Sequence, residues 1–439
     1  MINYIKLTHN GRANRMYSER SADGNQRKPP ATVFNQLKEF LDSNFLAWFF
    51  YNWRIKKRCR YPAAVGDSIH PLKSPDGGPV VRIGIAADWA TATPQSVFVG
   101  ERIRALRADY TIHLGDTYYS GSASEHADNF GQKPDDDTDA WARGRAGSFA
   151  LVGNHEMFSS GQAFMDMINS PRRGFGLTLP DGKFAGQQAP FCCLRSEHWC
   201  ILCLDTGYDS LHEQWYRRLF DLHPNNRKLK LPDLLMNWLE KVVDLRNEER
   251  GIIVLTHHQY ISAFTEEDEF QEPARQLQSL LPAGREVIWI NGHEHRFAMY
   301  RKYQQSPDHI TAWVRCIGHG GMADEHTKKR MVDPKKADRG LEVYDYRVAD
   351  TFHFDFAPPV DIGYNGYIDT QIEGDKLTIT FWAAYWNGSP QNIRYNKEML
   401  TETWQINKTS GALTRLSVID HTIGSDGETE LTYCNPRSR

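Results

Sequence analysis

The stretch YTIHLGDTYY, residues Tyr110–Tyr119, passes from an apolar run into a polar turn. The run Tyr110–Leu114 is typical of a buried β-strand. In sheets with helical crossovers, ligands are bound by the loops just past the carboxyl ends of the strands. The stretch therefore predicts a strand that presents Asp116 to a binding site.

Four other stretches of the sequence repeat this pattern of an apolar run followed by polar residues. The runs Val80–Ala87, Ser148–Val152, Ile252–Thr256 and Val287–Asn291 also predict strands. The polar residues that follow or end them are Asp88-Trp89-Ala90, Gly153-Asn154-His155-Glu156, Thr256-His257 and Gly292-His293-Glu294-His295. Each motif alone is common, but the ordered set indicates that one rim of the sheets gathers Asp, Asn and His side chains around one small cavity.

The ordered motifs resemble those of the calcineurin-like metallophosphoesterase superfamily, and within it the purple acid phosphatase branch. Most members of the superfamily begin with Asp-x-His, whereas this chain has Ala90 in the third position. Purple acid phosphatases also lack that histidine and have a tyrosine three residues after the second aspartate. Tyr119 stands at this spacing from Asp116. The resemblance covers about Val80 to Ala384.

The resemblance implies a site for two metal ions. By motif position, the first ion would be held by Asp88, Asp116, Tyr119 and His295, and the second by Asp116, Asn154, His257 and His293. Asp116 would bridge the ions, because a carboxylate has oxygens for both. A tyrosine ligand implies Fe(III) as the first ion, and the second would be divalent iron, zinc or manganese.

Two such ions, roughly 3.5–4 Å apart, polarise a phosphoryl group and lower the pKa of bound water. The predicted function is thus hydrolysis of a phosphomonoester or phosphodiester by metal-bound hydroxide. One alternative is a noncatalytic binding or scaffold protein on the same fold, which predicts missing ligands. Another is a phosphodiesterase directed at phospholipids or nucleic acids. The predicted partner is a phosphorylated small-molecule or lipid substrate.

Among the histidines that are not predicted ligands, His155 is the predicted catalytic residue. The resemblance implies that it approaches the phosphoryl oxygens and assists the leaving group, with Glu156 fixing its ring. His258 follows His257, and side chains alternate along a strand, so His258 is expected to pack or hydrogen-bond behind the site. His113 lies in an apolar run and is expected in the core, and His319, in a glycine-rich turn, is not predicted as a site residue.

The charge balance excludes a strongly basic protein. The sequence has 52 Lys and Arg against 55 Asp and Glu, a formal net charge of −3 in 439 residues. This gives no general attraction to nucleic acid or anionic membranes, and no stable nucleic-acid partner is indicated. No apolar run approaches the roughly 18 residues of a membrane span, and the N-terminus does not resemble a signal peptide.

Cysteine usage favours a cytoplasmic protein. The chain has 7 cysteines, and four of them crowd two apolar runs: Cys192, Cys193, Cys200 and Cys203. Cys200-x-x-Cys203 lacks a second pair at zinc spacing, so buried structural thiols are favoured over a redox pair or a zinc site.

The predicted organisation has three parts. Residues 1–79 form an N-terminal extension, 80–384 the catalytic domain, and 385–439 a β-rich extension packed on the core. The extension contains an aromatic and basic helix at 40–61, which is expected to pack on the enzyme domain, with contact to a membrane surface as the alternative. Hairpins are predicted at Gly363–Ala384 and Thr401–Leu416, and an amphipathic helix at Leu234–Val243.

The predicted fold class is α/β, a four-layer αββα metallophosphoesterase sandwich with an N-terminal helical extension and a C-terminal β-hairpin extension. The insertions Ser120–Gly147 and Thr206–Leu231 are interpreted as surface loops beside the site. The identity of the substrate and the oligomeric state are left open by the sequence.

Overall fold

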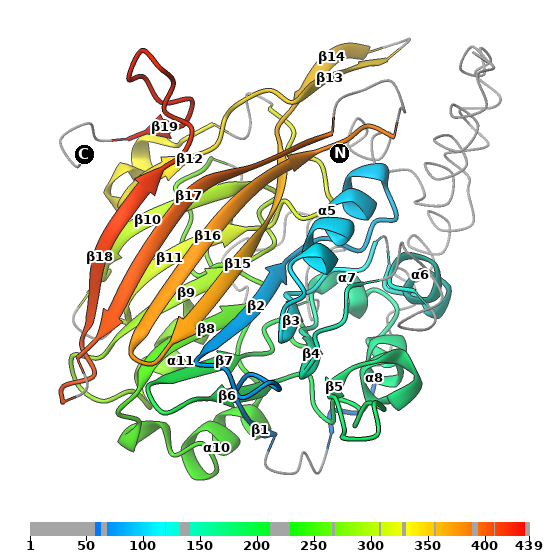
Figure 1. The fold of residues 1–439 in the computed structure, drawn as a ribbon, viewed down its shortest axis with the longest axis vertical. Helices are drawn as coiled ribbons and strands as arrows, with labels where there is room; N and C mark the ends of the chain where they lie inside the picture. Colours follow the sequence, from blue (N-terminus) through cyan, green and yellow to red (C-terminus); the bar gives the residue numbers. More distant parts are fainter. Residues whose placement is uncertain are drawn as a thin grey trace, which may run out of the picture.

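The computed structural model places two large β-sheets face to face, with helices on their outer sides (Figure 1). It describes residues 58–62, 68–118, 120–131, 141–210, 229–265, 268–306, 309–326, 331–354, 357–388, 394–407 and 409–434. Within these ranges the helices are α5 (Pro94–Ala105), α6 (Ala123–Asn129), α7 (Asn154–Met157), α8 (Gln162–Asn169), α10 (Asp233–Lys241) and α11 (Gln271–Gln278). Short 3₁₀ turns lie at η1 (Pro171–Arg173), η2 (Leu245–Asn247) and η4 (Pro334–Arg339).

The first sheet has eight strands in the order β18-β17-β16-β15-β2-β3-β4-β5. Its strands are β2 (Val80–Ala86), β3 (Tyr110–His113), β4 (Gly147–Ala150), β5 (Gly176–Leu177), β15 (Asn365–Glu373), β16 (Lys376–Tyr385), β17 (Tyr395–Ile406) and β18 (Leu413–Asp420). Strands β2, β3 and β4 run parallel, so their carboxyl ends lie at one edge. Strands β15 to β18 continue the sheet as antiparallel neighbours.

The second sheet has nine strands in the order β1-β6-β7-β8-β9-β11-β10-β12-β19. Its strands are β1 (Ile69–Pro71), β6 (Cys192–Arg195), β7 (Trp199–Cys203), β8 (Gly251–Thr256), β9 (Glu286–Asn291), β10 (Phe297–Tyr303), β11 (Thr311–Ile317), β12 (Leu341–Tyr344) and β19 (Thr432–Tyr433). Strands β7, β8, β9 and β11 are parallel. A separate hairpin pairs β13 (Asp350–Phe354) with β14 (Ala357–Ile362).

Alternating side chains of the central strands enter two different cores. Ile253 and Leu255 of β8 face the core between the sheets, whereas Ile252 and Val254 face a second core beneath α10 and α11. A third core lies between the eight-stranded sheet and α5 and α8. Strands that are buried on both faces are mostly apolar, which is why they appear in the sequence as nearly continuous apolar runs. The layers are therefore helix, sheet, sheet, helix, and the predicted α/β sandwich is confirmed.

Most of the predicted elements lie close to the observed ones. The five strands that precede the motifs are β2, β3, β4, β8 and β9, and their ends differ from the prediction by one or two residues. The hairpin predictions correspond to β15–β16 and β17–β18. Helix α10 buries Leu235, Trp238 and Leu239 as predicted, while Val242, just past its end, is 43% exposed.

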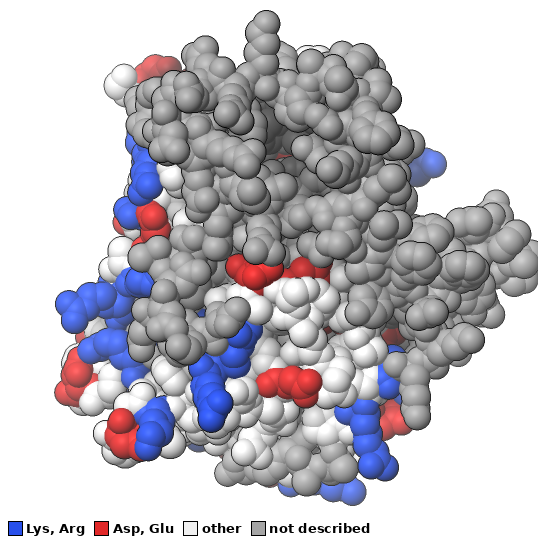
Figure 2. Space-filling view, turned by 90° about the vertical axis from the view of Figure 1, so that its right-hand side faces the viewer, with Lys and Arg blue, Asp and Glu red and all other residues white. Residues whose placement is uncertain are grey.

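Several predictions fall wholly or largely outside the described residues. These include the N-terminal helix at 40–61, of which the structure describes 58–61, and residues 211–228 of the insertion Thr206–Leu231. The insertion Ser120–Gly147 is described except for residues 132–140, and its interpretation as a surface loop was wrong in part, because it contains α6 and the buried rings of Phe130 and Trp141. Cys192, Cys193, Cys200 and Cys203 are buried free thiols, as predicted. Among the described residues, no helix is long and apolar enough to cross a membrane. Where Figure 2 shows described side chains, acidic and basic ones lie close to each other, in keeping with the formal net charge of −3.

Candidate metal centre

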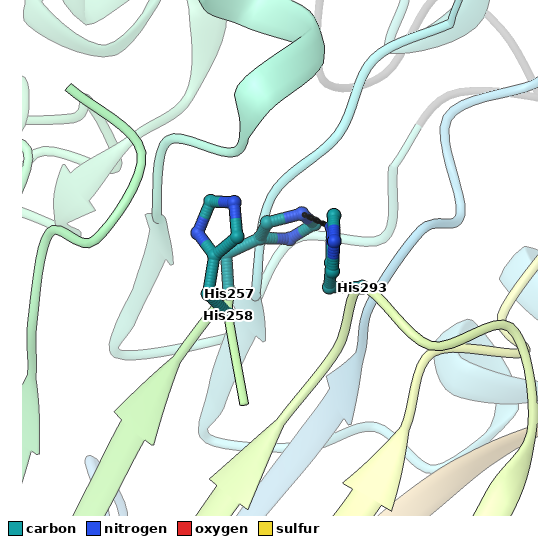
Figure 3. Close-up of side chains that lie close together, drawn as sticks. All are labelled: His257, His258 and His293. Carbon is teal, nitrogen blue, oxygen red and sulfur yellow. Dashed lines mark hydrogen bonds between the residues drawn. The ribbon is translucent and has the colours of Figure 1, made fainter. Parts of the chain in front are cut away.

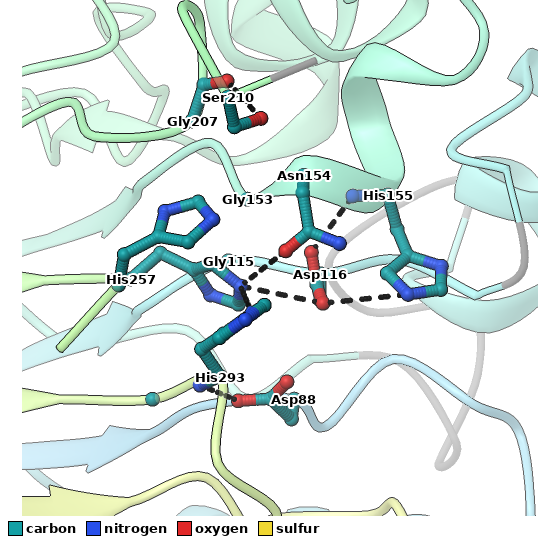
Figure 4. A network of polar contacts seen from close by, with 12 residues as sticks. Asp88, Gly115, Asp116, Gly153, Asn154, His155, Gly207, Ser210, His257 and His293 are labelled. Carbon is teal, nitrogen blue, oxygen red and sulfur yellow. Dashed lines mark hydrogen bonds and ion pairs between the residues drawn. The ribbon is translucent and has the colours of Figure 1, made fainter. Parts of the chain in front are cut away.

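Loops from both sheets meet at one small cluster of buried polar side chains (Figure 4). The eight-stranded sheet contributes Asp88 after β2, Asp116 after β3 and Asn154 at the start of α7. The nine-stranded sheet contributes His257 after β8, and His293 and His295 between β9 and β10. The structure thus brings together six of the residues predicted as ligands. Tyr119, the seventh, lies outside the described residues, so its role stays a prediction.

Three of these side chains converge around the Nε2 atom of the fourth, His257. It lies 3.3 Å from Asp116 Oδ2, 3.1 Å from Asn154 Oδ1 and 3.3 Å from His293 Nδ1. The other ring nitrogen of His257, Nδ1, is 3.0 Å from the carbonyl oxygen of Leu114. Such a carbonyl contact accepts the Nδ1 proton and fixes the tautomer in which Nε2 is a ligand. These four residues are the set predicted for the second ion.

A second convergence lies around the hydroxyl of Tyr118, which was not predicted from the sequence. The hydroxyl oxygen is 2.7 Å from Asp88 Oδ1, 3.2 Å from Asp116 Oδ2 and 2.9 Å from His295 Nε2. His295 Nε2 is in turn 3.4 Å from Asp88 Oδ1. These neighbours are the residues predicted for the first ion. The sequence did contain a signal, because GDTYY has two adjacent tyrosines, but the spacing rule selected Tyr119.

The donor set and its burial fit a pair of cations. Asp88 and Asp116 are 0% and 1% exposed, and buried carboxylates require cationic partners. Burial opposes ionisation of Asp116, yet the charges of His257 and His155 hold its pKa well below the ordinary value. Burial likewise disfavours the protonated form of His257, but Asp116 raises the pKa of this imidazole to about 9. Carboxylate, phenol, amide and imidazole groups together match the ligand preferences of iron, zinc and manganese.

The ligand loops have an unusual backbone. Asp88, Asp116 and His293 have φ values of +55°, +72° and +70°, in the left-handed region that residues other than glycine rarely adopt. Hydrogen bonds within the cluster hold these turns, because Asp88 Oδ2 accepts the backbone N–H of His293 at 2.9 Å. A Cβ atom on Gly153 would lie 2.1 Å from Asp116 Oδ1, so this position requires glycine.

His155 lies beside Asp116 at the edge of the cluster. Its backbone N–H donates to Asp116 Oδ1 at 2.9 Å, and its Nε2 is 3.8 Å from Asp116 Oδ2. The ring lies 4.3 Å from the ring of Tyr118 and 5.0 Å from that of Phe158, measured between centroids. Its side chain is 16% exposed, so it borders the metal cluster and reaches solvent.

Glu156 supports the centre through the backbone of the ligand loops. Its Oε2 atom accepts the N–H groups of Gly153 at 2.7 Å and Asp116 at 3.2 Å, and so ties the second and third motifs together. Burial and the neighbouring Asp116 raise the pKa of Glu156 to about 7. The sequence predicted a supporting role for Glu156, but through the ring of His155.

The remaining histidines separate into core and site. His113 is buried among the rings of Trp89, Phe130 and Trp141, and burial lowers its pKa to about 3, as expected for a core residue. His258 was expected to pack or hydrogen-bond behind the site. It packs against Phe270 and lies within hydrogen-bond distance of Thr206, but the expected place behind the site was wrong. Strand β8 ends at Thr256, so the alternation along a strand does not extend to it, and its ring lies beside those of His257 and His293 (Figure 3).

Comparisons with known proteins agree with this fold. Residues 81–297 match the family model of the calcineurin-like phosphoesterases. The chain has no match among curated proteins. A solved structure of PhoD is similar at 11% identity, covering 79% of this chain and 73% of that one, with a TM-score of 0.47.

Two further solved structures are similar. Purple acid phosphatase PPD1 from yellow lupin (Lupinus luteus) seeds shares 14% identity over 76% of this chain and 54% of its own, with a TM-score of 0.41. GAP50, described as the anchor in the inner membrane complex of Plasmodium, shares 12% identity over 73% and 88%, also with a TM-score of 0.41.

Proposed function

We propose that this chain hydrolyses phosphomonoesters or phosphodiesters at a centre of two metal ions, because residues 81–297 match the family model of the calcineurin-like phosphoesterases. The observation that supports the proposal is that two sets of ligand atoms, one around Tyr118 Oη and one around His257 Nε2, share the carboxylate of Asp116. A shared carboxylate between two clusters of donors is the arrangement that a pair of bridged cations requires.

In this proposal the first ion is held by Asp88, Asp116, His295 and a phenol oxygen. The geometry favours Tyr118 as the source of that oxygen, whereas motif spacing predicted Tyr119. The second ion is held by Asp116, Asn154, His257 and His293. A phenolate ligand favours Fe(III) in the first position, with divalent iron, zinc or manganese in the second. When bound, the ions would lower the pKa of water and neutralise charge on the phosphoryl group.

The side chains of the protein would orient the substrate and supply a proton donor. His155 is placed to donate a hydrogen bond to a phosphoryl or leaving-group oxygen, because it lies beside Asp116 and is accessible from solvent. The rings of Tyr118 and Phe158 restrict its rotation. The substrate class that we propose is a phosphorylated small molecule or lipid, and the cytoplasm is the proposed location.

The scaffold alternative predicts that ligand positions have been lost. Each of the six described ligand positions holds a residue of the expected type, and all six lie in the cluster. The presence of all six residues in one cluster, with left-handed backbone at Asp88, Asp116 and His293, supports the enzyme over the scaffold.

The experiment that tests the proposed function is elemental analysis of the purified protein together with hydrolysis of p-nitrophenyl phosphate and bis-p-nitrophenyl phosphate. About two metal ions per chain and measurable hydrolysis are expected for the wild type. Asp116→Asn should lose most of the activity and bound metal, because the bridge to both ions is removed. The preference between the two substrates would distinguish monoester from diester hydrolysis.

The matched control is Asp181→Asn, the same chemical change at an exposed carboxylate that pairs with Lys183. It should leave metal content and activity unchanged. A wild-type protein that binds no metal and remains inactive after incubation with Fe, Zn and Mn salts would reject the enzyme and favour the scaffold.

A further inference from the structure

The ring of His258 lies beside the rings of His257 and His293 (Figure 3). Its centroid is 4.6 Å from that of His293 and 4.7 Å from that of His257. The ring of Phe270 packs edge-on against it at 5.0 Å and also contacts His293. His258 is 2% exposed, so its position is fixed by packing and not by solvent.

The ring nitrogens of the three histidines are close enough for a common ion. One nitrogen each of His257, His258 and His293 lies within 4.8 Å of the other two. Imidazole nitrogens that bind one zinc ion at about 2.0–2.1 Å lie up to about 4.2 Å apart. In a tetrahedral site the nitrogens lie roughly 3.4 Å apart, so binding of one ion by all three would draw the loops together by up to about 1.4 Å.

Thr206 sets the tautomer that His258 needs as a ligand. The hydroxyl oxygen of Thr206 accepts the backbone N–H of His258 at 3.0 Å and lies 3.1 Å from its Nδ1. If Nδ1 carries the proton and donates it to this oxygen, Nε2 keeps a lone pair. A histidine that binds a metal usually donates its other ring N–H to an oxygen in this way, as His257 does with the Leu114 carbonyl.

We propose that His258 is a further protein ligand of the second metal ion, through Nε2, held in place by Thr206. The inference rests on the proposed function, since it assumes that the second ion is bound. The ion would then have three imidazoles besides Asp116 and Asn154. Such a nitrogen-rich site favours zinc, divalent iron or cobalt over magnesium and calcium.

The test is a titration of the metal-free protein with Co²⁺ and Zn²⁺, measured against a chromophoric chelator, with the visible spectrum of bound Co²⁺ as a second signal. Wild type should bind two ions. His258→Ala should still bind one ion tightly, and its affinity for the other should fall at least tenfold with a changed Co²⁺ spectrum. Thr206→Val should lower the affinity for the same ion by about tenfold or more, because the hydrogen-bond partner of a ligand is lost. Thr206→Ser, which keeps the hydroxyl, should restore that affinity.

His126→Gln is the matched control, because His126 is also buried but lies in α6 outside the cluster. It should bind both ions like the wild type. If His258→Ala does not fold, His258→Gln keeps a polar side chain of similar size and gives the same comparison.

The possible results separate the two proposals. Two ions bound by both wild type and His258→Ala, with affinities within about twofold and identical Co²⁺ spectra, would overturn the role of His258 and leave the proposed function intact. A wild-type protein that binds neither Co²⁺ nor Zn²⁺ would overturn both proposals.

Discussion

At the scale of single residues, Tyr118 shows where counting along a motif is insufficient. The ligand spacing of the resembling family selects Tyr119, but the hydroxyl that reaches Asp88 and His295 belongs to Tyr118. Spacing gives the number of intervening residues, whereas the direction of a side chain follows from backbone dihedrals. Asp116, at φ +72°, turns the chain just before this residue. The other six residues of the cluster could be predicted because each stands in a polar motif within a few residues of the end of a strand.

The two tyrosines can be distinguished by spectroscopy. Fe(III) bound to a phenolate gives a visible charge-transfer band, so the protein loaded with Fe(III) should be coloured. Tyr118→Phe should lose this band, and Tyr119→Phe, the neighbouring control, should keep it. If the band is instead lost in Tyr119→Phe and kept in Tyr118→Phe, Tyr119 is the ligand.

Asp205 makes the stability depend on pH. It is fully buried and accepts the N–H groups of Gly207 and Tyr208, and burial raises its pKa to about 7. An unfolded aspartate has a pKa of about 3.9. Between about pH 4 and 7 the native state therefore binds one proton more than the unfolded state, and the free energy of unfolding falls as pH rises through this window.

Asp205→Asn should remove this contribution, because the amide cannot ionise and its oxygen can still accept both backbone N–H groups. The free energy of unfolding of the wild type relative to the variant should fall by up to about 1.4 kcal/mol per pH unit in this window and level off above pH 7. Urea unfolding at several pH values measures this difference. If the free energies of unfolding of the two proteins change with pH in parallel, Asp205 is not the group that causes this pH dependence.

At the scale of elements, β2, β3, β4, β8 and β9 were predictable because each is largely buried on both faces and therefore mostly apolar. The loop conformations could not be predicted. His258, for example, lies beside His257 and His293 because β8 ends at Thr256, where the alternation of side chains along the strand stops. A buried ion pair between the two sheets could not be predicted from the sequence either. Arg315 in β11 and Glu402 in β17 form a bidentate ion pair, 2.6 and 2.5 Å, with both side chains 0% exposed.

Breaking this ion pair from one side should destabilise the protein strongly. Arg315→Met leaves Glu402 buried, with Arg415 at 3.4 Å as a remaining partner. Loss of one member of a buried pair costs about 3–5 kcal/mol, whereas replacing both members by apolar residues is often close to neutral. The double variant Arg315→Met/Glu402→Leu should thus be more stable than Arg315→Met. A double-mutant cycle by chemical denaturation measures the coupling, and additive effects would show that the pair contributes nothing.

At the scale of the whole molecule, the centre lies where the carboxyl ends of strands from the two sheets meet. Asp88 and Asp116 come from one sheet, and His257, His293 and His295 from the other. Ions bound between them would join the sheets, so metal binding and folding should be linked.

Removal of the metals should therefore lower the stability of the whole protein. An ion that binds only the native state adds about 2.7 kcal/mol when its free concentration is 100 times its dissociation constant. Urea unfolding with a chelator, and again after Zn²⁺ is restored, measures this loss and its recovery. The free energy of unfolding of Asp116→Asn should change much less between these two conditions, because this variant has lost the carboxylate shared by both ions. Equal stability of the wild type under both conditions would show that the ions do not bridge the sheets.

The left-handed backbone at Asp88, Asp116 and His293 has a consequence for protein engineering. Each such residue costs about 1–3 kcal/mol relative to an unstrained conformation, and glycine would relieve it. A selection for thermal stability in the presence of a chelator, where bound ions add nothing, would favour glycine at these positions and would remove the side chains of the cluster. Engineering for stability should therefore leave these three residues unchanged, because backbone strain favours glycine there whereas metal binding requires their side chains.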